Sequence, residues 1–403
     1  MPESNPSARF EAVDWDAVDR SRRLLTAERV VLLVGLTALA AAWLYDTYVA
    51  HVYIVFEWQV HRVDWVVLLG GVLLAAYVGV PMVRNRDETL AVLRALFSRR
   101  VTAAGTIVVG LLVVVGVLGP ALISTPSLRF QYAWHPPFGT STELAGGDCV
   151  GEITTDNRIT QYCHGTLEGY PFGANHRGHP MEWLVANGAR TALYVAVFTM
   201  AFVVPVATVV GVIAGLRGGL LDDLLMAYVD VQLSVPAIIV YFIGYMYWNP
   251  SLLLLLVTFG LLSWGGIARL VRSEVLQRRE AGFVMVARSL GAPQTYLARR
   301  HILPNVTNTL VPSVFQLVAL LILVEAGIAF LGFQEAYVHS WGATIAEGVD
   351  PTQTVGNVRG LDLHPHQYWW VATLPAFGLG VTIAAFKIVG DGLRDALDPR
   401  SVH

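Results

Sequence analysis

The chain has 403 residues, of which 55% are hydrophobic and only 14% are charged. Soluble domains carry about 25% charged residues, so this composition excludes a string of soluble domains and indicates a polytopic membrane protein. The net charge of −3 gives no reason to expect a nucleic-acid partner.

Long apolar runs follow one another along most of the chain. A bilayer core about 30 Å thick is crossed by about 20 apolar residues in a helix, and runs of this kind predict eight spans. They lie near residues 30–49, 65–84, 101–124, 187–215, 221–247, 250–271, 306–332 and 368–390. The first run follows a polar segment and is too long for a signal peptide. Arginines concentrate on one side of these spans, which predicts cytoplasmic termini in a multi-pass protein of the cell membrane.

Both cysteines fall in residues 125–186, a segment rich in Gly, Pro and Thr that the arginine pattern places outside the cell. A disulfide between Cys149 and Cys163 would close a loop of about 15 residues and stabilise it by roughly 3 kcal/mol. Two free thiols are the alternative. We expect no metal site, because His164 beside two cysteines leaves a zinc ion without a fourth ligand.

Polar groups inside the predicted spans are candidates for a substrate path, because ionisable groups are costly in a membrane. These candidates are Tyr228, Asp230, Gln232, Gln316 and Glu325. The alternative for the two acidic residues is hydrogen bonding between helices. Near the cytoplasmic boundary, we expect Asp222 and Asp223 to be solvated or to lie in a turn.

The stretch FVMVARSLGAPQTYLARRHILPN, residues 283–305, lies between two predicted spans. Its apolar spacing predicts a short helix that ends at Gly291 and Pro293, followed by a second helix, after which Pro304 opens the next span. The first helix is either an amphipathic helix resting on lipid headgroups or a docking surface for another protein. No GxxxxGK[ST], HExxH or GxSxG motif occurs, so we expect no ATPase site or other enzyme activity in this chain.

This stretch resembles the cytoplasmic loop of ABC importer permeases, and more narrowly that of the C-type subunit of the dipeptide, oligopeptide and nickel permease family. The family's loop reads close to A-R-x-L-G-A and ends R-H-I-L-P-N, as residues 287–292 and 300–305 do here. Further resemblances occur in order from about residue 101 to 400. They are PFG at 171–173, GAR at 188–190, WGGIARLVR at 264–272, EAGIAFLGF at 325–333, SWG at 340–342 and GDGLRDALDPR at 390–400.

The sequence departs from the family pattern at three places. Met285 stands where the loop signature has Glu, which puts a salt bridge from that position to an ATPase in doubt. The family motif T-D-x-x-G-R-D after PFG is replaced by residues 174–180. Residues 141–170 resemble an insertion, because a second PFG-like sequence precedes them at 136–140.

The resemblance implies an all-α polytopic fold, the transmembrane domain of a type I ABC importer, with about eight spans of which two are additional at the N-terminus. It divides the chain into a cytoplasmic tail at 1–28, two additional transmembrane helices at 29–86, a cytoplasmic linker and first family span at 87–124, an extracellular insertion at 125–186, a permease core at 187–391 with its coupling loop at 273–305, and a cytoplasmic tail at 392–403.

The resemblance further implies a permease subunit of an ATP-driven importer of dipeptides or oligopeptides. Its expected partners are a B-type permease, two cytosolic ATPases that bind ATP and Mg, and an extracellular solute-binding protein; the chain itself holds no cofactor. Breaks at Gly291 and Pro304 would let the coupling helix move as a rigid unit. The residues implied in ATPase coupling are Met285, Ala287, Arg288, Ser289, Leu290, Gly291, Ala292, Leu303 and Pro304. Oligosaccharide or nickel cargo, or a secondary transporter working alone, are the alternatives.

Overall fold

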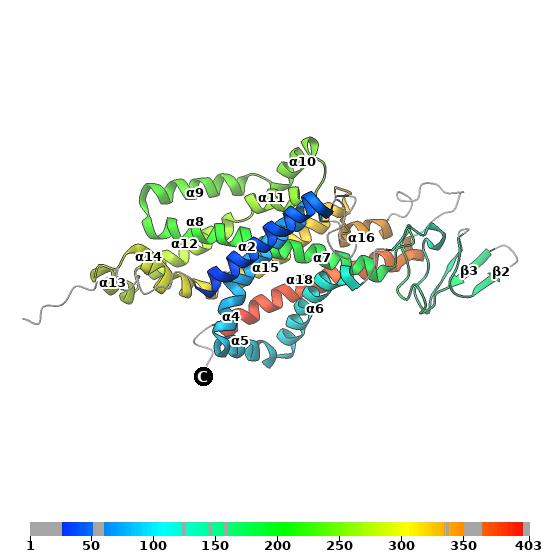
Figure 1. The fold of residues 1–403 in the computed structure, drawn as a ribbon, viewed down its shortest axis with the longest axis horizontal. Coiled ribbons are helices and arrows are strands. Elements are labelled where there is room, and N and C mark those ends of the chain that lie inside the picture. Colours follow the sequence, from blue (N-terminus) through cyan, green and yellow to red (C-terminus); the bar gives the residue numbers. More distant parts are fainter. Residues whose placement is uncertain are drawn as a thin grey trace, which may run out of the picture.

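A computed structural model of the chain describes residues 26–50, 60–122, 126–144, 147–156, 160–333, 335, 338–349 and 365–397. Its helices run side by side along one long axis (Figure 1). One end of the molecule carries the short helices α13 (Gly282–Ser289) and α14 (Gln294–Leu297), and the opposite end carries a small β-sheet. Most of the predicted tail at 1–28 and part of the predicted tail at 392–403 lie outside the described residues.

The first half of the described chain contains the following elements. They are α2 (Ala27–Tyr45), η1 (Asp46–Ala50), α3 (Arg62–Leu74), η2 (Ala75–Gly79), α4 (Val80–Arg84), α5 (Arg86–Ser98), α6 (Arg100–Leu122), η3 (Phe130–Tyr132), β1 (Ser141–Glu143), β2 (Ile153–Asp156), β3 (Thr160–His164), α7 (Met181–Phe198) and η4 (Thr199–Val203).

The second half is helical throughout most of its described part. Its elements are α8 (Val204–Arg217), α9 (Gly219–Ser234), α10 (Ala237–Tyr247), α11 (Leu252–Leu262), α12 (Gly265–Arg279), α13 (Gly282–Ser289), α14 (Gln294–Leu297), η5 (Ala298–Ile302), α15 (Leu303–Phe330), α16 (Trp341–Val349), η6 (Pro365–Tyr368) and α18 (Trp369–Leu397).

Within the described residues, seven helices are long and apolar enough to cross a membrane, and the α9–α10 pair makes up to eight. The predicted span at 221–247 is broken in the structure, where α9 and α10 meet at a bend of 72°. Pro236 explains the bend: it lacks an amide hydrogen, and it holds the preceding Val235 in an extended conformation.

Two other predicted boundaries move in the structure. The helix at the start of the core begins at Met181, directly after the extended Pro180, and not at residue 187. The helix before the coupling loop continues to Arg279, so residues 273–279 are helical and the loop is shorter than predicted.

The main core lies where α7, α8, α11, α12 and α15 meet. Small residues let two of these helices approach closely, which is how helices associate where lipid removes the hydrophobic driving force. A Cβ atom on Gly211 would lie 2.7 Å from the Val271 side chain, and one on Gly215 would lie 2.7 Å from Val275. We therefore expect α8 and α12 to move as one unit.

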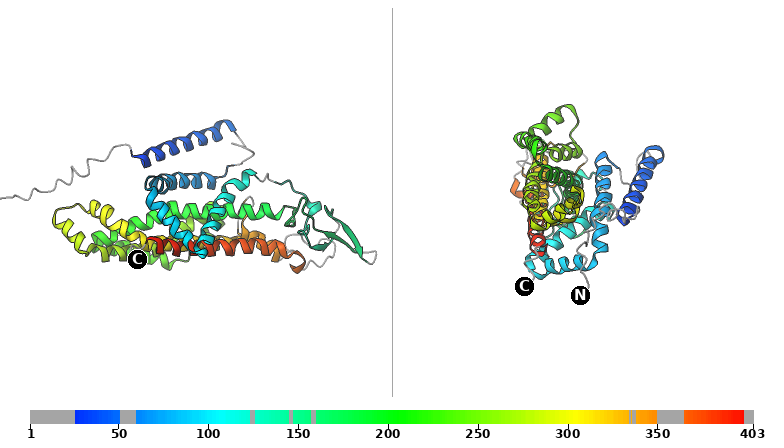
Figure 2. Two further views of the ribbon diagram at one scale, coloured as in Figure 1. Left: turned by 90° about the horizontal axis from the view of Figure 1, so that it is seen from below. Right: turned by 90° about the vertical axis from the view of Figure 1, so that its left-hand side faces the viewer.

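A polar cluster attaches the N-terminal pair of spans to this core. The carboxylate of Asp64 on α3 is buried and accepts hydrogen bonds from the Arg190 guanidinium (3.0 Å) and the Tyr194 hydroxyl, both on α7. The backbone amide of His61 donates to the same carboxylate at 2.7 Å. By contrast, α2 has no buried residue in its described range and stands apart from the bundle over most of its length (Figure 2).

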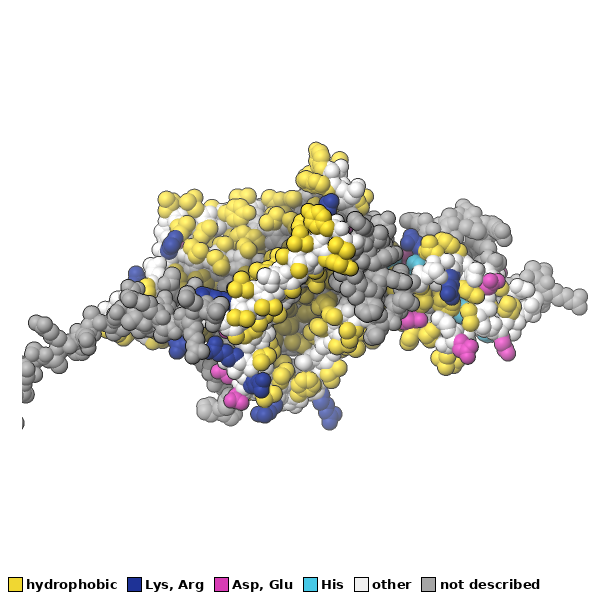
Figure 3. Space-filling model, in the orientation of Figure 1, with side chains coloured by type: hydrophobic (Ala, Val, Ile, Leu, Met, Phe, Trp, Pro, Cys, Tyr) yellow, Lys and Arg dark blue, Asp and Glu magenta, His cyan; other side chains and the backbone are white. Residues whose placement is uncertain are grey.

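The end opposite α13 carries the three strands in the order β1-β3-β2, all antiparallel. In the register, Cys163 on β3 lies opposite Thr142 and Ile153. Hydrophobic side chains cover most of the middle of the molecule in Figure 3, while charged ones gather toward its ends. This distribution is that of a protein whose middle faces lipid.

Candidate functional site

The α13 segment folds around a small core of its own. Val284, Ala292 and Leu297 are buried against one another. The helix ends in a Schellman motif: the Ala292 amide donates to the Ala287 carbonyl at 3.1 Å, and the Gly291 amide donates to the Arg288 carbonyl at 3.0 Å. Gly291 has φ of +79°, a conformation that costs any side-chain-bearing residue free energy.

The other face of α13 is open. Met285, Val286 and Leu290 are 54%, 61% and 57% exposed, and Arg288 and Ser289 are exposed beside them. The predicted coupling residues thus divide into two groups. Ala287 and Ala292 form part of the small core that supports the helix. The exposed residues present an apolar surface with one cation.

The break predicted at Pro304 is absent from the structure. Helix α14, the π-helical turn η5 and α15 follow one another without a gap from Gln294 to Phe330. Pro304 stands in the first turn of α15, where a proline costs little, because the wider π-helical turn precedes it. Leu303 and Pro304 are exposed on this continuous helix, so the free breaks around α13 lie at residues 280–281 and 290–293.

Three of the five predicted path residues lie together, on α9 against α12. Asp230 forms an ion pair with Arg269, although the two side chains are 61% and 48% exposed. The Tyr228 ring stacks on Trp264 with centroids 5.9 Å apart. Gln232 is buried, and its amide donates to a backbone carbonyl at the end of α11. Because Arg269 already neutralises Asp230, this carboxylate is less suited to bind a peptide's amino group than the sequence suggested.

The remaining two predicted path residues lie elsewhere. Glu325 on α15 is buried and lines a small cavity with Tyr241, whose hydroxyl donates to the Phe333 carbonyl at 2.7 Å. Gln316 is exposed on the same helix. The cavity at Glu325 is lined by residues of α10, α11 and the segment before α16, so Glu325 does not join the group around Asp230.

A buried ion pair that we had not predicted lies at the start of α9. The Asp222 carboxylate accepts two hydrogen bonds from the Arg272 guanidinium, at 2.5 and 2.6 Å. The expectation that Asp222 is solvated is therefore wrong; only 6% of the residue is exposed. One signal was present in the sequence: Arg272 follows Arg269 by three residues, which puts both cations on one face of a helix.

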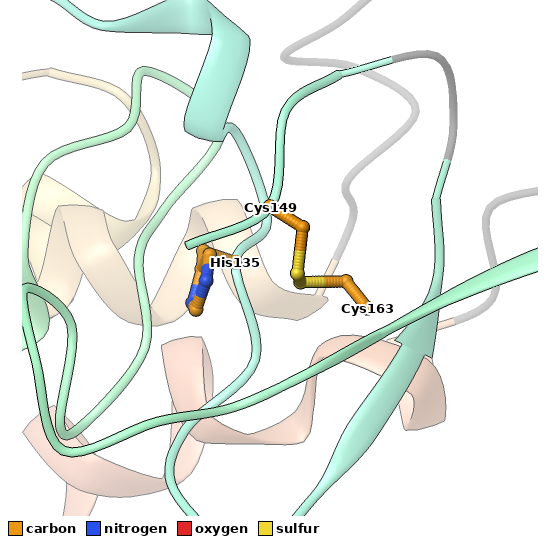
Figure 4. Close-up of side chains that lie close together, drawn as sticks. All are labelled: His135, Cys149 and Cys163. Carbon is orange, nitrogen blue, oxygen red and sulfur yellow. A yellow bond between two sulfur atoms is a disulfide. The ribbon is translucent and has the colours of Figure 1, made fainter. Parts of the chain in front are cut away.

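The sheet end contains the predicted disulfide. Cys149 and Cys163 are bonded, with Cα atoms 5.7 Å apart, and His135 lies beside them (Figure 4). Both sulfurs are used in the bridge. The His135 ring also has two partners, the Pro136 carbonyl at 3.0 Å from Nδ1 and the Val150 amide at 3.3 Å from Nε2. This group therefore acts as a structural support and does not offer open metal ligands.

A second polar group at this end joins residues 174–180 to α16. Glu347 accepts a hydrogen bond from the Asn175 side chain at 3.0 Å and lies 3.3 Å from Nδ1 of His176. Burial opposes the charged carboxylate, yet these partners hold the pKa of Glu347 below its usual range. Burial lowers the pKa of His179, and it lowers the pKa of His339 to about 4. Both of these imidazoles are therefore neutral at pH 7.

Several residues of the SWG, GAR and PFG motifs pack at contacts between helices. The Trp341 indole of SWG donates to the Val185 carbonyl at 3.0 Å and lies against Gly188 of GAR. Gly173 of PFG has φ of +83° and lies against Trp370, whose indole donates to the Ala174 carbonyl at 3.1 Å. These motifs fix how α7, α16 and α18 meet.

Comparison with known proteins gives the family. Residues 207–403 match the family described as "Binding-protein-dependent transport system inner membrane component". The chain is 30% identical over 230 residues to the dipeptide transport system permease protein DppC of Bacillus subtilis, covering 57% of this chain and 68% of that protein. It is 31% identical over 237 residues to the oligopeptide transport system permease protein OppC of Haemophilus influenzae, covering 58% and 72%.

A solved structure, the inward-facing MetNI methionine ABC transporter, covers 55% of this chain and 99% of its own, with a TM-score of 0.43 and 19% identity. That value is too low to carry a conclusion, and the assignment rests on the sequence relatives. The chain is a multi-pass membrane protein that belongs to the dipeptide and oligopeptide permease family of ABC importers.

Proposed function

We propose that this chain is one permease subunit of an ATP-driven importer of dipeptides or oligopeptides, and that it forms the translocation path together with a second permease. The relatives named above are permeases for dipeptides and oligopeptides, which supports the same cargo class here. ATP and Mg would be bound by partner subunits and not by this chain.

One observation carries the proposal: α13 is held firmly on one side and open on the other. Its buried side is fixed by Val284 and the Schellman motif, while Met285 and Val286 are more than half exposed. A supported helix with exposed apolar side chains at the end of a membrane bundle suits insertion into a groove of a soluble partner. We assign this surface to a cytosolic ATPase, and the α13 end would then lie in the cytoplasm.

Two further surfaces fit the remaining partners. Along α9, Leu220, Leu224 and Val231 are 74%, 59% and 64% exposed. This apolar face, beside the pair Asp230–Arg269, is the proposed contact with the second permease and the edge of the path. The sheet end lies opposite α13, so it would face outward and receive the solute-binding protein (Figure 1).

The test is a pull-down from native membranes with the tagged chain. A Met285→Asp/Val286→Asp double variant places charge on the exposed face of α13 while leaving its small core intact. Leu90→Asp on the amphipathic helix α5 is the control, because Leu90 is similarly exposed at 46%. We expect wild type and control to bring down two ATPases and a second permease, and the double variant to lose only the ATPases.

Recovery of no ATPase with the wild-type chain would contradict the proposal. Cargo is tested separately, by reconstituting the purified complex and measuring ATP hydrolysis with its binding protein loaded with short peptides. Stimulation by an oligosaccharide or nickel, with none by peptides, would keep the importer and reject the peptide cargo.

A further inference from the structure

The two N-terminal spans form a wedge that is closed at one end. Helices α2 and α3 are antiparallel and touch at Gly35, where a Cβ atom would lie 2.5 Å from the Val72 side chain. Beyond that contact, Glu28 lies 3.7 Å from Arg84. Toward the other end the two helices separate (Figure 2), and the described contacts of α2 are with α3, η2 and α4.

The open part of the wedge is a groove of about 480 Å³. Its described walls are apolar apart from one cation. They comprise Leu36, Leu39, Ala40 and Trp43 of α2, Arg62, Trp65, Val66 and Leu69 of α3, and Leu253 of α11. Arg62 stands in the first turn of α3, at the mouth of the groove, where Trp43 and Trp65 also lie. Tryptophan beside arginine at the end of a span marks the level of the lipid headgroups.

Arg62 lacks the charged partner that the neighbouring Asp64 has within the described residues. The neighbouring Asp64 is committed to Arg190 and Tyr194 on α7. Within the part of the chain that the structure describes, Arg62 forms no ion pair, and its side chain is exposed. An exposed guanidinium above an apolar groove between helices matches an anionic headgroup with an acyl chain beneath it.

We propose that the wedge between α2 and α3 binds one lipid with an anionic phosphate headgroup. An acyl chain fills the apolar groove down to the Gly35–Val72 contact, and Arg62 holds the phosphate. Apart from Arg62 its described lining is apolar, which suits a lipid tail better than a soluble ligand. The inference does not depend on which cargo the importer carries.

The experiment uses the full chain in its purified complex, reconstituted in nanodiscs made of phosphatidylglycerol and phosphatidylcholine in equal parts. Lipids that remain bound after release from the nanodisc are identified by native mass spectrometry. Arg62→Gln removes the cation and keeps the groove. Ala40→Trp fills the groove, and Ala38→Trp is its matched control, because residue 38 lies on the opposite face of the same helix.

We expect wild type and Ala38→Trp to retain one phosphatidylglycerol per chain. Arg62→Gln should lose the preference for phosphatidylglycerol over phosphatidylcholine, and Ala40→Trp should lose the bound lipid. The proposal is overturned if wild type retains no lipid, or if Ala40→Trp retains as much as Ala38→Trp. It is also overturned if the groove of the native complex holds the helix of another polypeptide.

Discussion

At the scale of single residues, two ion pairs join α9 to α12, the helix that leads into α13. Arg272 holds Asp222 with two short hydrogen bonds, and Arg269 holds Asp230 along the same interface. Helix α12 continues from these arginines to Arg279, directly before the short connection to α13. Movement of α12 would therefore carry α9 with it.

Replacing Arg272 by Gln should destabilise the protein. The substitution leaves the buried Asp222 carboxylate without its cation, and loss of one partner from a fully buried pair costs about 3–5 kcal/mol. We expect roughly 2 kcal/mol, because a third of the Arg272 side chain is exposed. Thermal unfolding of the purified chain in detergent measures the change.

Arg278→Gln on the same helix is the control. Arg278 lies 3.9 Å from Glu274 and is 42% exposed, and such pairs contribute little. Equal losses of thermal stability in the two variants would show that the Arg272–Asp222 pair contributes no more than an exposed pair.

The residue types of the candidate site could be predicted from the sequence, but their partners could not. Asp230, Gln232 and Glu325 stand out because polar groups are rare in apolar runs. Their grouping depends on which helices touch: α9 meets α12, while Glu325 faces α10 and α11. Apolar patterning specifies neither contact. The same reason explains why Asp222 was assigned to solvent.

At the scale of elements, α13 depends on the glycine that ends it. Gly291→Ala should loosen this loop, because an alanine at φ of +79° costs about 1–2 kcal/mol. We expect faster amide hydrogen exchange in α13 and weaker recovery of the ATPases, with the second permease still bound. Gly282→Ala in the same helix is the control, since its Cβ would meet nothing within 4 Å. Equally weak recovery of the ATPases with both variants would show that the Schellman motif is not what positions α13.

The contact of α3 with α7 depends on Asp64. Asp64→Asn removes the charge that Arg190 and Tyr194 share, so α3 should open more often from the bundle. Amide exchange in α3 should become at least about tenfold faster, which corresponds to about 1.4 kcal/mol. Asp87→Asn, an exposed residue at the start of α5, should leave α3 unchanged. Unchanged exchange in Asp64→Asn would mean that apolar packing alone holds α3.

Long apolar runs predicted the spans well, because length and hydropathy are all that a crossing helix needs. The effect of individual prolines on helix continuity was harder to predict. Pro236 breaks the fifth span, since the residue before it is extended, whereas Pro304 follows a π-helical turn and is accommodated without a gap in the helix. The three-stranded sheet was not predicted, because its strands have only three to five residues.

At the scale of the whole molecule, the sheet end should respond to pH. The sheet end holds neutral His179 and His339 next to the ionised Glu347, with His176 and Arg177 facing them. The folded pKa of His339, about 4, is below the unfolded value of 6.5, so the folded state binds fewer protons. Stability should therefore fall as the pH drops from 6.5 toward 4. The lowered pKa of Glu347 acts in the same direction.

Hydrogen exchange at about pH 7 and about pH 5, corrected for intrinsic rates, tests this expectation. Protection in residues 174–184 and 340–349 should decrease at the lower pH, while protection in α12 should not. His339→Gln should weaken the pH effect, because it removes the imidazole whose pKa burial lowers to about 4. An equal loss in α12 would indicate global unfolding in place of a local opening.

Helix α15 has a geometric consequence for the whole molecule. At about 1.5 Å per residue, its 28 residues measure about 42 Å, more than the thickness of a bilayer core, which is about 30 Å. A partner that contacts its first turn, near Leu303, contacts the same helix that carries Glu325. A small tilt at that end would therefore displace the far end of the helix.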